Sequence, residues 1–482
     1  MSARSPIADH LVELLGPDNV VTDEQELRAS SIDRYRKYQD VHGVYVLPPP
    51  VAIAYARTTA DVAAVLSYAD AHGINVVPRT GRSATEGGLE TAVERSIVLD
   101  GSRMNRILHI DPDNMQVTVE CGVRLQDLED ELRPLGLTTG HSPQSKPLAQ
   151  MGGLTATRSI GQLSTLYGGI EDMVIGLEAV FPDGTVTRIK NVPRRAAGPD
   201  IRHLVIGNEG ALCYITEVTV KLFRFTPETT RFLGYRLASM ATGFSVLREV
   251  MVTGLRPAVM RLYDEDDAQG HFAPVAQGQC VMVFSAEGHQ RLVDATIATI
   301  EEIVAAHPEV EPLDPAYFQH WFDHLNWGEE QIRQEREEIL QTSEIGFTTE
   351  VSGSWSIIHD IYRSTVDRVR AEIGALTWIG GHSSHSYQTG TNVYFTYYYK
   401  VDCAPEDEVA TYHKPINRII CEQALALGGS IVHHHGIGKA RTPWTEAEHG
   451  SAYHLLHTLK AAFDPHGVMN AGTIFPLEEN PS

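Results

Sequence analysis

The sequence predicts an α+β protein with two large domains. Over residues 47–225, short strands and helices alternate without the regular βαβ rhythm of a doubly wound sheet. Residues 226–430 combine longer helical runs with further strands, which indicates a second α+β domain. We expect a helical segment over residues 1–46 and a loop-rich C-terminal segment over residues 431–482 to complete the chain.

Within the first domain, residues 58–73 carry the signals of one helix. Thr59 can cap its start and Gly73 its end. Its apolar face, at helical spacing, consists of Val62, Val65, Leu66 and Ala69. The other elements expected here are strands at 51–56, 74–78, 96–101, 115–122 and 211–223, a helix at 123–136, and a hairpin around the Pro-Asp-Gly turn at 182–184.

The second domain is expected to contain helices at 294–307 and 355–374. Strand candidates rich in aromatic and β-branched residues lie at 280–288 and 392–402. No internal repeat and no low-complexity tract interrupts the pattern. The chain therefore has the organisation of a globular enzyme or binding protein rather than that of a fibrous or repeat protein.

Charge and composition exclude several classes of function. The chain has 39 basic and 62 acidic side chains, a formal net charge of −23 that repels phosphate backbones and anionic lipid, so we expect no nucleic-acid partner. It contains no run of about 18 apolar residues and no signal-peptide pattern, so we expect no integral membrane contact. Five scattered cysteines without a CxxC pair favour a reducing compartment, and we expect a cytoplasmic protein.

Three segments of small residues can bring backbone amides close to a ligand. They span residues 78–88, 142–161 and 207–215; each is expected to end or start a strand, each contains paired or closely spaced glycines, and the first two also carry Ser and Thr hydroxyls. Glycine tolerates the backbone curl that lets successive N–H groups converge on an anion. Neither a Walker A pattern nor GxGxxG is present. A surface loop would explain any one of these segments, but together they favour one extended, dinucleotide-sized ligand.

A second group of motifs is rich in histidine. Residues 381–387 read Gly-His-Ser-Ser-His-Ser-Tyr, Tyr394 follows, and residues 433–435 are three consecutive histidines before a glycine turn. An isolated histidine would be interpreted as a polar strand-end residue. Three adjacent ones beside a tyrosine favour proton transfer.

The strings PRTGRSATEGG, MGGLTATRSIG, YGGIEDMVIGLEAVFPDGTV and RHLVIGNEGALCYITEVTV resemble the vanillyl-alcohol-oxidase superfamily of FAD-linked oxidases. RRAAGPDIRHLVIGNEG, GHSSHSYQTGTNVYF and GGSIVHHHGIGKAR are most similar to the alkyldihydroxyacetone-phosphate synthase branch and its bacterial FAD-linked oxidoreductase relatives. The resemblance implies a two-subdomain FAD-binding domain of the p-cresol methylhydroxylase (PCMH) type. It also implies a second α+β substrate (cap) domain with an antiparallel sheet.

The resemblance also implies which residues hold FAD. Arg82 and Ser83 stand where some members carry a histidine that tethers the flavin, so we expect noncovalent FAD. The C-terminal stretch 463–472 resembles a loop that folds back toward the flavin. The FAD-binding residues implied in this way are Pro78, Arg79, Thr80, Gly81, Arg82, Ser83, Ala84, Gln144, Ser145, Gln150, Gly152, Gly153, Thr157, Arg158, Ser159, Ile160, Glu209, Gly210, Ile215 and Asn470.

For the reaction, the resemblance maps the proton-transferring residue onto Tyr394, with three histidines around it and an active-site arginine at Arg261. The catalytic residues expected are Tyr394, His433, His434, His435 and Arg261. Substrate-binding residues expected are His382, His385 and Arg333, the last with Arg336 as an alternative register.

We expect no metal. Relatives that oxidise D-2-hydroxy acids carry a second histidine and a glutamate that can hold a divalent ion. Here Tyr394 and His434 stand at those positions. A phenol is a poor ligand for zinc or manganese, and the hard anionic donor is lost.

Three functions follow as hypotheses. The first is an FAD-dependent oxidoreductase, with hydride transfer to the flavin from a small, anionic, hydroxyl-bearing substrate and an electron acceptor of unknown identity. The alternative is a redox-neutral alkylglycerone-phosphate synthase-like transferase that holds a substrate fragment at the flavin N5. A noncatalytic FAD-holding scaffold is disfavoured by the Tyr/His/Arg set. A homodimer is an expectation from the family alone.

Overall fold

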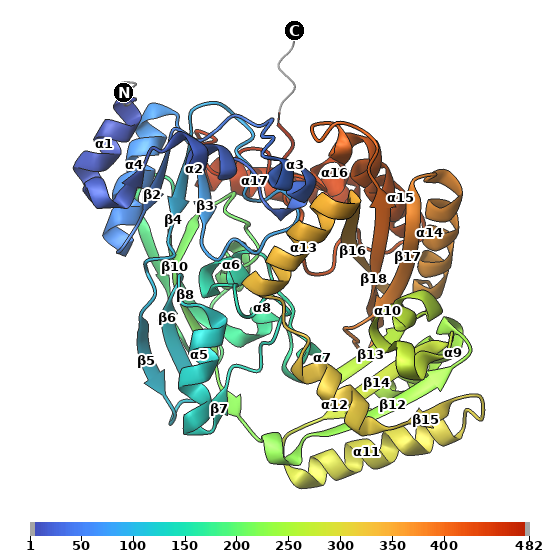
Figure 1. The fold of residues 1–482 in the computed structure, drawn as a ribbon. Helices are drawn as coiled ribbons and strands as arrows, with labels where there is room; N and C mark the ends of the chain where they lie inside the picture. Colours follow the sequence, from blue (N-terminus) through green and yellow to red (C-terminus); the bar gives the residue numbers. More distant parts are fainter. Residues whose placement is uncertain (1–4, 478–482) are drawn as a thin grey trace.

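The computed structural model describes residues 5–477 and divides into two halves (Figure 1). The first half contains a four-stranded sheet, a five-stranded sheet and a two-stranded pairing, and the second is built on one large sheet, so the expected α+β class is confirmed. In the described part of the chain, no helix is both long and apolar enough to cross a membrane. The domain limits expected from the sequence stay a prediction.

The first half begins with a four-stranded sheet in the order β1-β2-β4-β3. Both β2 and β3 pair with β4 in parallel, and β1 pairs with β2 antiparallel. Helix α4 packs its buried face on this sheet beside α1. The strands are β1 (Val20–Val21), β2 (Ala52–Tyr55), β3 (Asn75–Arg79) and β4 (Ser96–Asp100).

A five-stranded antiparallel sheet follows in this half, in the order β5-β6-β10-β8-β9. The Pro-Asp-Gly turn joins β8 to β9, so the predicted hairpin is confirmed. The strands are β5 (Ile107–Asp111), β6 (Gln116–Glu120), β8 (Val174–Val180), β9 (Val186–Ile189) and β10 (Tyr214–Lys221). A separate two-stranded pairing joins β7 (Leu137–Thr138) to β11 (Phe223–Arg224).

The second half contains a seven-stranded sheet in the order β15-β12-β14-β13-β17-β18-β16, antiparallel throughout. The expected antiparallel sheet of the second domain is thus confirmed. Its strands are β12 (Arg231–Leu237), β13 (Val259–Tyr263), β14 (Cys280–Ala286), β15 (Glu311–Leu313), β16 (Glu344–Ser354), β17 (Leu376–Ser383) and β18 (Gly390–Lys400).

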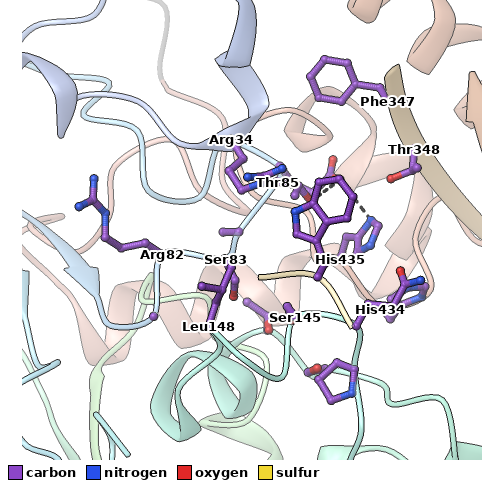
Figure 2. A pocket seen from close by; sticks show the side chains of 18 of the residues that line it. Arg34, Arg82, Ser83, Thr85, Ser145, Leu148, Phe347, Thr348, His434 and His435 are labelled. Atoms are coloured by element: carbon purple, nitrogen blue, oxygen red, sulfur yellow. Dashed lines mark hydrogen bonds and ion pairs between the residues drawn. The ribbon is translucent and has the colours of Figure 1, made fainter. Parts of the chain in front are cut away.

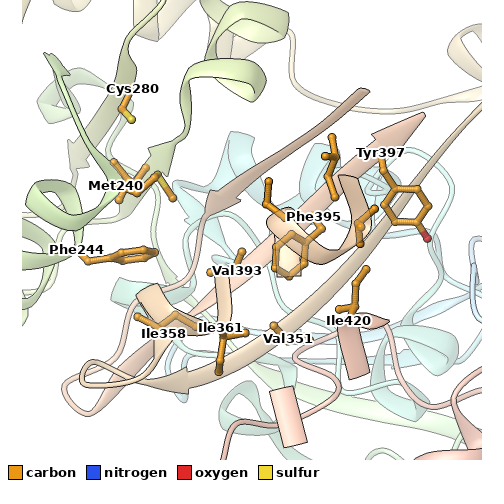
Figure 3. Close-up of a cluster of buried hydrophobic side chains, with 14 of the residues drawn as sticks. Met240, Phe244, Cys280, Val351, Ile358, Ile361, Val393, Phe395, Tyr397 and Ile420 are labelled. Carbon is orange, nitrogen blue, oxygen red and sulfur yellow. The ribbon is translucent and has the colours of Figure 1, made fainter. Parts of the chain in front are cut away.

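One face of the seven-stranded sheet builds the largest apolar core (Figure 3). Alternate residues of its strands, such as Val351, Val393 and Phe395, meet Ile361 of α14 and Ile420 of α15, all with exposed fractions of 0 %. Since successive strand residues point to opposite faces, Glu350 and Tyr394 point away from this core. That other face is turned toward the first half of the molecule and carries the polar groups described below.

The helices cover the sheets and connect the two halves. Helix α13 crosses between them in Figure 1, packing on α3 and on β16. The α-helices are α1 (Pro6–Leu15), α2 (Glu24–Ala29), α3 (Lys37–His42), α4 (Thr59–His72), α5 (Leu125–Leu132), α6 (Met151–Ala156), α7 (Ser164–Tyr167), α8 (Ile170–Met173), α9 (Met240–Val252), α10 (Glu265–Ala276), α11 (Gln290–Ala305), α12 (Pro315–Asp323), α13 (Glu329–Thr342), α14 (Ile358–Glu372), α15 (Lys414–Ala426), α16 (Thr445–His449) and α17 (Tyr453–Phe463).

The start of α4 differs from the expectation. The cap is Thr58, whose hydroxyl accepts from the Asp61 N–H while the Asp61 carboxylate accepts from the Thr58 N–H. Thr59 is already helical, and its hydroxyl donates to Glu178 at 2.8 Å. Thr58 rather than Thr59 is the N-cap because its backbone is extended and Asp61 follows three positions later, so the two residues form a reciprocal capping box. The predicted cap at Gly73 is confirmed, with a left-handed φ of 60°.

The C-terminal segment returns to the first half. The Asn470 N–H donates to the Val76 carbonyl on β3, and the Val76 N–H donates to the Val468 carbonyl. These two bonds continue the edge of the four-stranded sheet. The last described residues therefore lie beside the first small-residue segment, which follows β3.

Candidate active site

A cavity of about 1230 Å³ lies between the two halves and is lined by both. Figure 2 shows Arg82, Ser83 and Leu148 on one side and His434 and His435 on another. The sequence-predicted residues that line it are Pro78, Arg79, Thr80, Gly81, Arg82, Ser83, Ala84, Gln144, Ser145, Gln150, Gly152, Gly153, Thr157, Ser159, Ile160, Glu209, Gly210, Ile215, Arg261, His382, His385, Tyr394, His434 and His435. Residues as far apart in sequence as Gly81 and His435 thus share one cavity.

The first small-residue segment presents free amides to this cavity. Among the described residues, the backbone N–H groups of 81–85 donate no hydrogen bond. A side chain on Gly81 would lie 2.6 Å from the Leu148 carbonyl, so only glycine allows this close approach. Arg82 adopts φ 56°, a left-handed conformation that is costly outside glycine and common at binding sites. The curl of free donors fits an anionic group such as a diphosphate.

The second segment differs from its expected setting, because it does not adjoin a strand but folds into the short helix α6. Its contacts still fit a bound ligand. The buried Gln150 Oε1 has no hydrogen-bond partner within the described chain. A side chain on Gly153 would lie 2.9 Å from the Thr80 hydroxyl, so this glycine keeps the first two segments together. An unpartnered buried amide at a cavity wall is available to a ligand.

The third segment connects the first half to the histidine loop. Glu209 has φ 48°, and its carboxylate accepts from the Ile437 and Gly438 N–H groups at 2.8 and 2.7 Å. Burial raises the pKa of Glu209 to about 7. Glu209 therefore holds the glycine turn that follows the three histidines.

Two residues expected to bind FAD do not line the cavity. Arg158 points outward with a half-exposed side chain and pairs with Glu171 at 3.3 Å. Asn470 instead ties loops together: its amide donates to the Gly88 and Glu209 carbonyls at 3.0 and 2.8 Å. It also accepts from the buried Lys439 ammonium at 2.8 Å. The structure thus places Asn470 behind the cavity wall.

A buried carboxylate, Glu350, fixes the histidine loop. One of its oxygens accepts from the backbone N–H groups of His433, His434 and His435 at 3.2, 3.0 and 2.9 Å. Its other oxygen receives the Arg441 guanidinium at 2.8 Å. Both side chains are 0 % exposed. Glu350 therefore fixes the backbone that carries the three imidazoles.

The three consecutive histidines differ in charge. Burial lowers the pKa of His433 to about 4 and holds the pKa of His434 well below its usual value. For His435 burial also opposes the cation, but Glu350, 2.7 Å from Nδ1, holds the pKa well above its usual value. Near neutral pH, His433 and His434 are neutral and His435 is an imidazolium.

Tyr394 lies among these rings. Its ring stacks on His382 with centroids 4.8 Å apart and on His434 at 5.7 Å, and meets His435 edge-on at 5.4 Å. Its hydroxyl donates to Thr348 at 2.8 Å. Tyr394 therefore has both a neutral imidazole and a cation in contact with its ring.

Arg261 and His382 form a second polar wall. The guanidinium donates to His382 Nε2 at 3.0 Å and to Gln162, and lies over the Trp321 ring. Since Nε2 accepts, His382 Nδ1 donates to Asp267. Burial lowers the pKa of His382 to about 4, so it is neutral. Within the described chain the buried Arg261 Nε has no partner, which leaves a charged donor free for a substrate anion.

A hydrogen-bond chain runs outward from His434. His434 Nδ1 and His433 Nδ1 are 2.8 Å apart, and His433 Nε2 is 2.7 Å from the Tyr387 hydroxyl. Tyr387 is 38 % exposed and lines a separate surface hollow together with His433. His385 packs on this chain, its ring stacked on His433, and its Nδ1 meets Ser164 at 2.8 Å.

Arg333 and Arg336 lie apart from these groups. Arg333 is on the outer face of α13, with 62 % of its side chain exposed and ion pairs to Glu330 and Glu337. Arg336 pairs with Asp40. Neither lines the cavity.

Sequence reasoning missed Glu350, Arg441, Asp267 and Glu86. A signal existed for Glu350, because it is a charged residue on a strand whose neighbouring residues Thr349 and Val351 are buried.

Two groups of side chains gather closely enough to share a metal ion: His385, His433 and His434, and Glu86, Glu350 and His435. In the first group, Ser164 and the His433–His434 contact already engage the Nδ1 atoms. In the second, Arg441 supplies the positive charge. We assign neither group as a metal site, and the absence of a metal stays a prediction.

Comparison with known proteins gives two family matches. Residues 50–190 match the family described as "FAD binding domain", and residues 226–474 match "FAD linked oxidases, C-terminal domain". The chain is 60 % identical to a protein of Escherichia coli strain K12 named "Uncharacterized FAD-linked oxidoreductase YgcU", over 99 % of both chains. It is 26 % identical to the alkyldihydroxyacetonephosphate synthase of Trypanosoma brucei brucei, over 98 % of this chain and 81 % of that one.

A solved structure of p-cresol methylhydroxylase with substrate bound superposes with a TM-score of 0.78. It is 17 % identical and covers 98 % of this chain and 97 % of its own. The similarity shows the fold, and it agrees with the PCMH-type architecture expected from the sequence.

We predict that Arg441→Met strongly destabilises the protein, because it leaves Glu350 and Glu86 buried with His435 as their sole ion-pair partner among the described residues. Removing one partner of a buried ion pair costs about 3–5 kcal/mol. Urea unfolding followed by circular dichroism measures the change. The matched control is Arg418→Met, whose partly exposed pair with Glu422 on α15 is worth less than about 1 kcal/mol. Equal unfolding midpoints for the two variants would contradict the assignment.

Proposed function

The chain belongs to the FAD-linked oxidase family, and from that membership we propose that it oxidises a small, anionic, hydroxyl-bearing substrate with noncovalent FAD. The observation that carries the proposal is the juxtaposition of Tyr394, neutral His434 and the unpartnered Arg261 Nε at one cavity. They offer a proton acceptor and a charged donor side by side.

The residues fit FAD in three respects. The free amides of 81–85 suit its diphosphate, and the unpartnered Gln150 amide suits a polar group along the ligand. The left-handed Arg82 and Glu209 bring backbone close to the cavity. Bound FAD would supply the acceptor for a hydride from the substrate carbon. No histidine lies in residues 78–88, which supports noncovalent binding through that segment.

We assign Arg261 to the carboxylate or phosphate of the substrate, because its guanidinium is buried and keeps one N–H free. His382 orients it through Nε2, and Asp267 fixes the His382 tautomer. The substrate hydroxyl proton would pass to neutral His434, or to Tyr394 once that phenol has itself given up its proton. His435 is already protonated and so is not the base.

The second candidate is the redox-neutral synthase, favoured by the match to the Trypanosoma brucei brucei enzyme over nearly the whole chain. The two candidate reactions differ in their net redox change: the oxidation transfers two electrons from the substrate to the flavin, whereas the synthase reaction has no net electron transfer. The net charge of −23 favours a water-soluble substrate, because an acidic protein is repelled by an anionic membrane that would present a lipid substrate.

The first test is anaerobic mixing of the FAD-bound protein with a panel of D- and L-2-hydroxy acids and sugar acids. We expect at least one to bleach the visible flavin absorbance, and prior dialysis against EDTA to leave the bleaching unchanged. If no compound bleaches it while acyl-dihydroxyacetone phosphate and a fatty alcohol yield an ether, the synthase proposal replaces ours. Loss of bleaching after EDTA would show that a metal is required.

A second test concerns Tyr394. We expect Tyr394→Phe to keep bound FAD but to lose about 10²–10⁴-fold in turnover, the usual contribution of a general acid or base. The FAD absorbance and steady-state rate are measured together. Tyr68→Phe on α4, which removes a hydroxyl that does not line the cavity, serves as the control. Full activity in Tyr394→Phe would rule out its role in proton transfer.

A third test concerns the chain from His434 to Tyr387. If protons leave by this route, Tyr387→Phe should slow turnover roughly tenfold, less than loss of a group that touches the substrate. Added imidazole should restore the rate, since a small buffer can carry the proton instead. A slow variant that imidazole does not rescue would indicate a structural role for the hydroxyl.

A further inference from the structure

Four ionisable side chains are packed together behind Tyr394. Arg441 and Glu350 are 0 % exposed, Glu86 is 6 % exposed, and His435 is 19 % exposed. The Arg441 guanidinium pairs with Glu350 at 2.8 Å and with Glu86 at 3.1 Å. His435 Nδ1 lies 2.7 Å from Glu350 and 3.5 Å from Glu86.

A proton on His435, which lies between the two carboxylates, balances the charges of this group. Two carboxylates face one guanidinium, and within residues 5–477 no other lysine or arginine lies within ion-pair distance of either. A buried unpaired charge is costly, and a proton on His435 removes the excess negative charge. The other groups facing His435 are the neutral His434 and the Tyr394 ring, and neither supplies a competing cation.

We propose that His435 is a fixed imidazolium whose charge raises the reduction potential of the bound flavin. The proposal rests on the proposed function in one respect, since it requires the flavin ring at the end of the cavity that His435 lines. A cation beside a reducible ring favours the form that has gained electrons. His435 then acts by its charge, while His434 and Tyr394 handle the proton.

The arrangement explains why carboxylates from two distant elements converge on one imidazole. Glu350 comes from β16 in the second half, and Glu86 from the first small-residue segment. Either one alone would be neutralised by Arg441. With both present, a proton on His435 supplies the second positive charge, and the two carboxylates that hold it come from the two halves of the molecule.

The test measures the flavin midpoint potential of the FAD-bound protein by equilibration with indicator dyes, which needs no substrate. His435→Gln is expected to lower the reduced-to-oxidised ratio at a given potential at least tenfold, about 30 mV for a two-electron couple. The matched control is His434→Gln, which also removes an imidazole but no charge. Its ratio should change less than twofold, although both variants lose turnover.

A second variant, Glu86→Gln, keeps the imidazole and weakens its anionic surroundings. The pKa of His435 should then fall, because one of two attracting carboxylates is lost. As the pH rises through that lowered pKa, His435 loses its proton and the potential drops. A plot of potential against pH from about 6 to 9 should show an inflection absent from the wild type.

These outcomes decide the proposal. It is overturned if His435→Gln and His434→Gln shift the potential equally, or if Glu86→Gln shows the wild-type pH plot. Should His435→Gln fail to retain FAD, the Glu86→Gln plot decides alone. A failure of the proposed function looks different: no hydroxy acid bleaches the flavin, while the potential shifts are still measured.

Discussion

The site depends on one buried carboxylate. Glu350 accepts three consecutive backbone amides of the histidine loop and pairs with Arg441, and neither side chain has any exposed surface. A loop of 433–438 without such an acceptor would leave its amides unsatisfied at the cavity wall. Because Glu350 lies on β16, its carboxylate fixes the histidine loop relative to the seven-stranded sheet. The same carboxylate then sets the charge of His435.

The three consecutive histidines of the loop differ in protonation state. His433 and His434 are neutral because burial disfavours their cations, while His435 is protonated because two carboxylates outweigh that cost. A single loop thereby offers a base, a relay and a cation. Proton transfer and electrostatic stabilisation can be performed by neighbours without competing for one proton.

The two halves of the molecule line the cavity with different kinds of groups. On the first half it is made from backbone, with free amides of 81–85 and left-handed residues such as Arg82 and Glu209. On the second half it is made from side chains that project from the strands of the large sheet, such as Arg261 on β13 and Tyr394 on β18. Backbone donors suit any ligand with a diphosphate, whereas the side chains distinguish one substrate from another.

Local sequence determined much of this protein. Small-residue segments, the Pro-Asp-Gly hairpin and the apolar face of α4 are properties of neighbouring residues, so they could be recognised without a structure. So could the gathering of Tyr394 with the histidines, through resemblance to a family. What only the tertiary structure decided are pairings between distant residues. Glu350 meets His435 across 85 positions, Arg333 turns to solvent, and the three histidines take different charges. Burial and ion pairing depend on which elements pack together, and no local pattern specifies that.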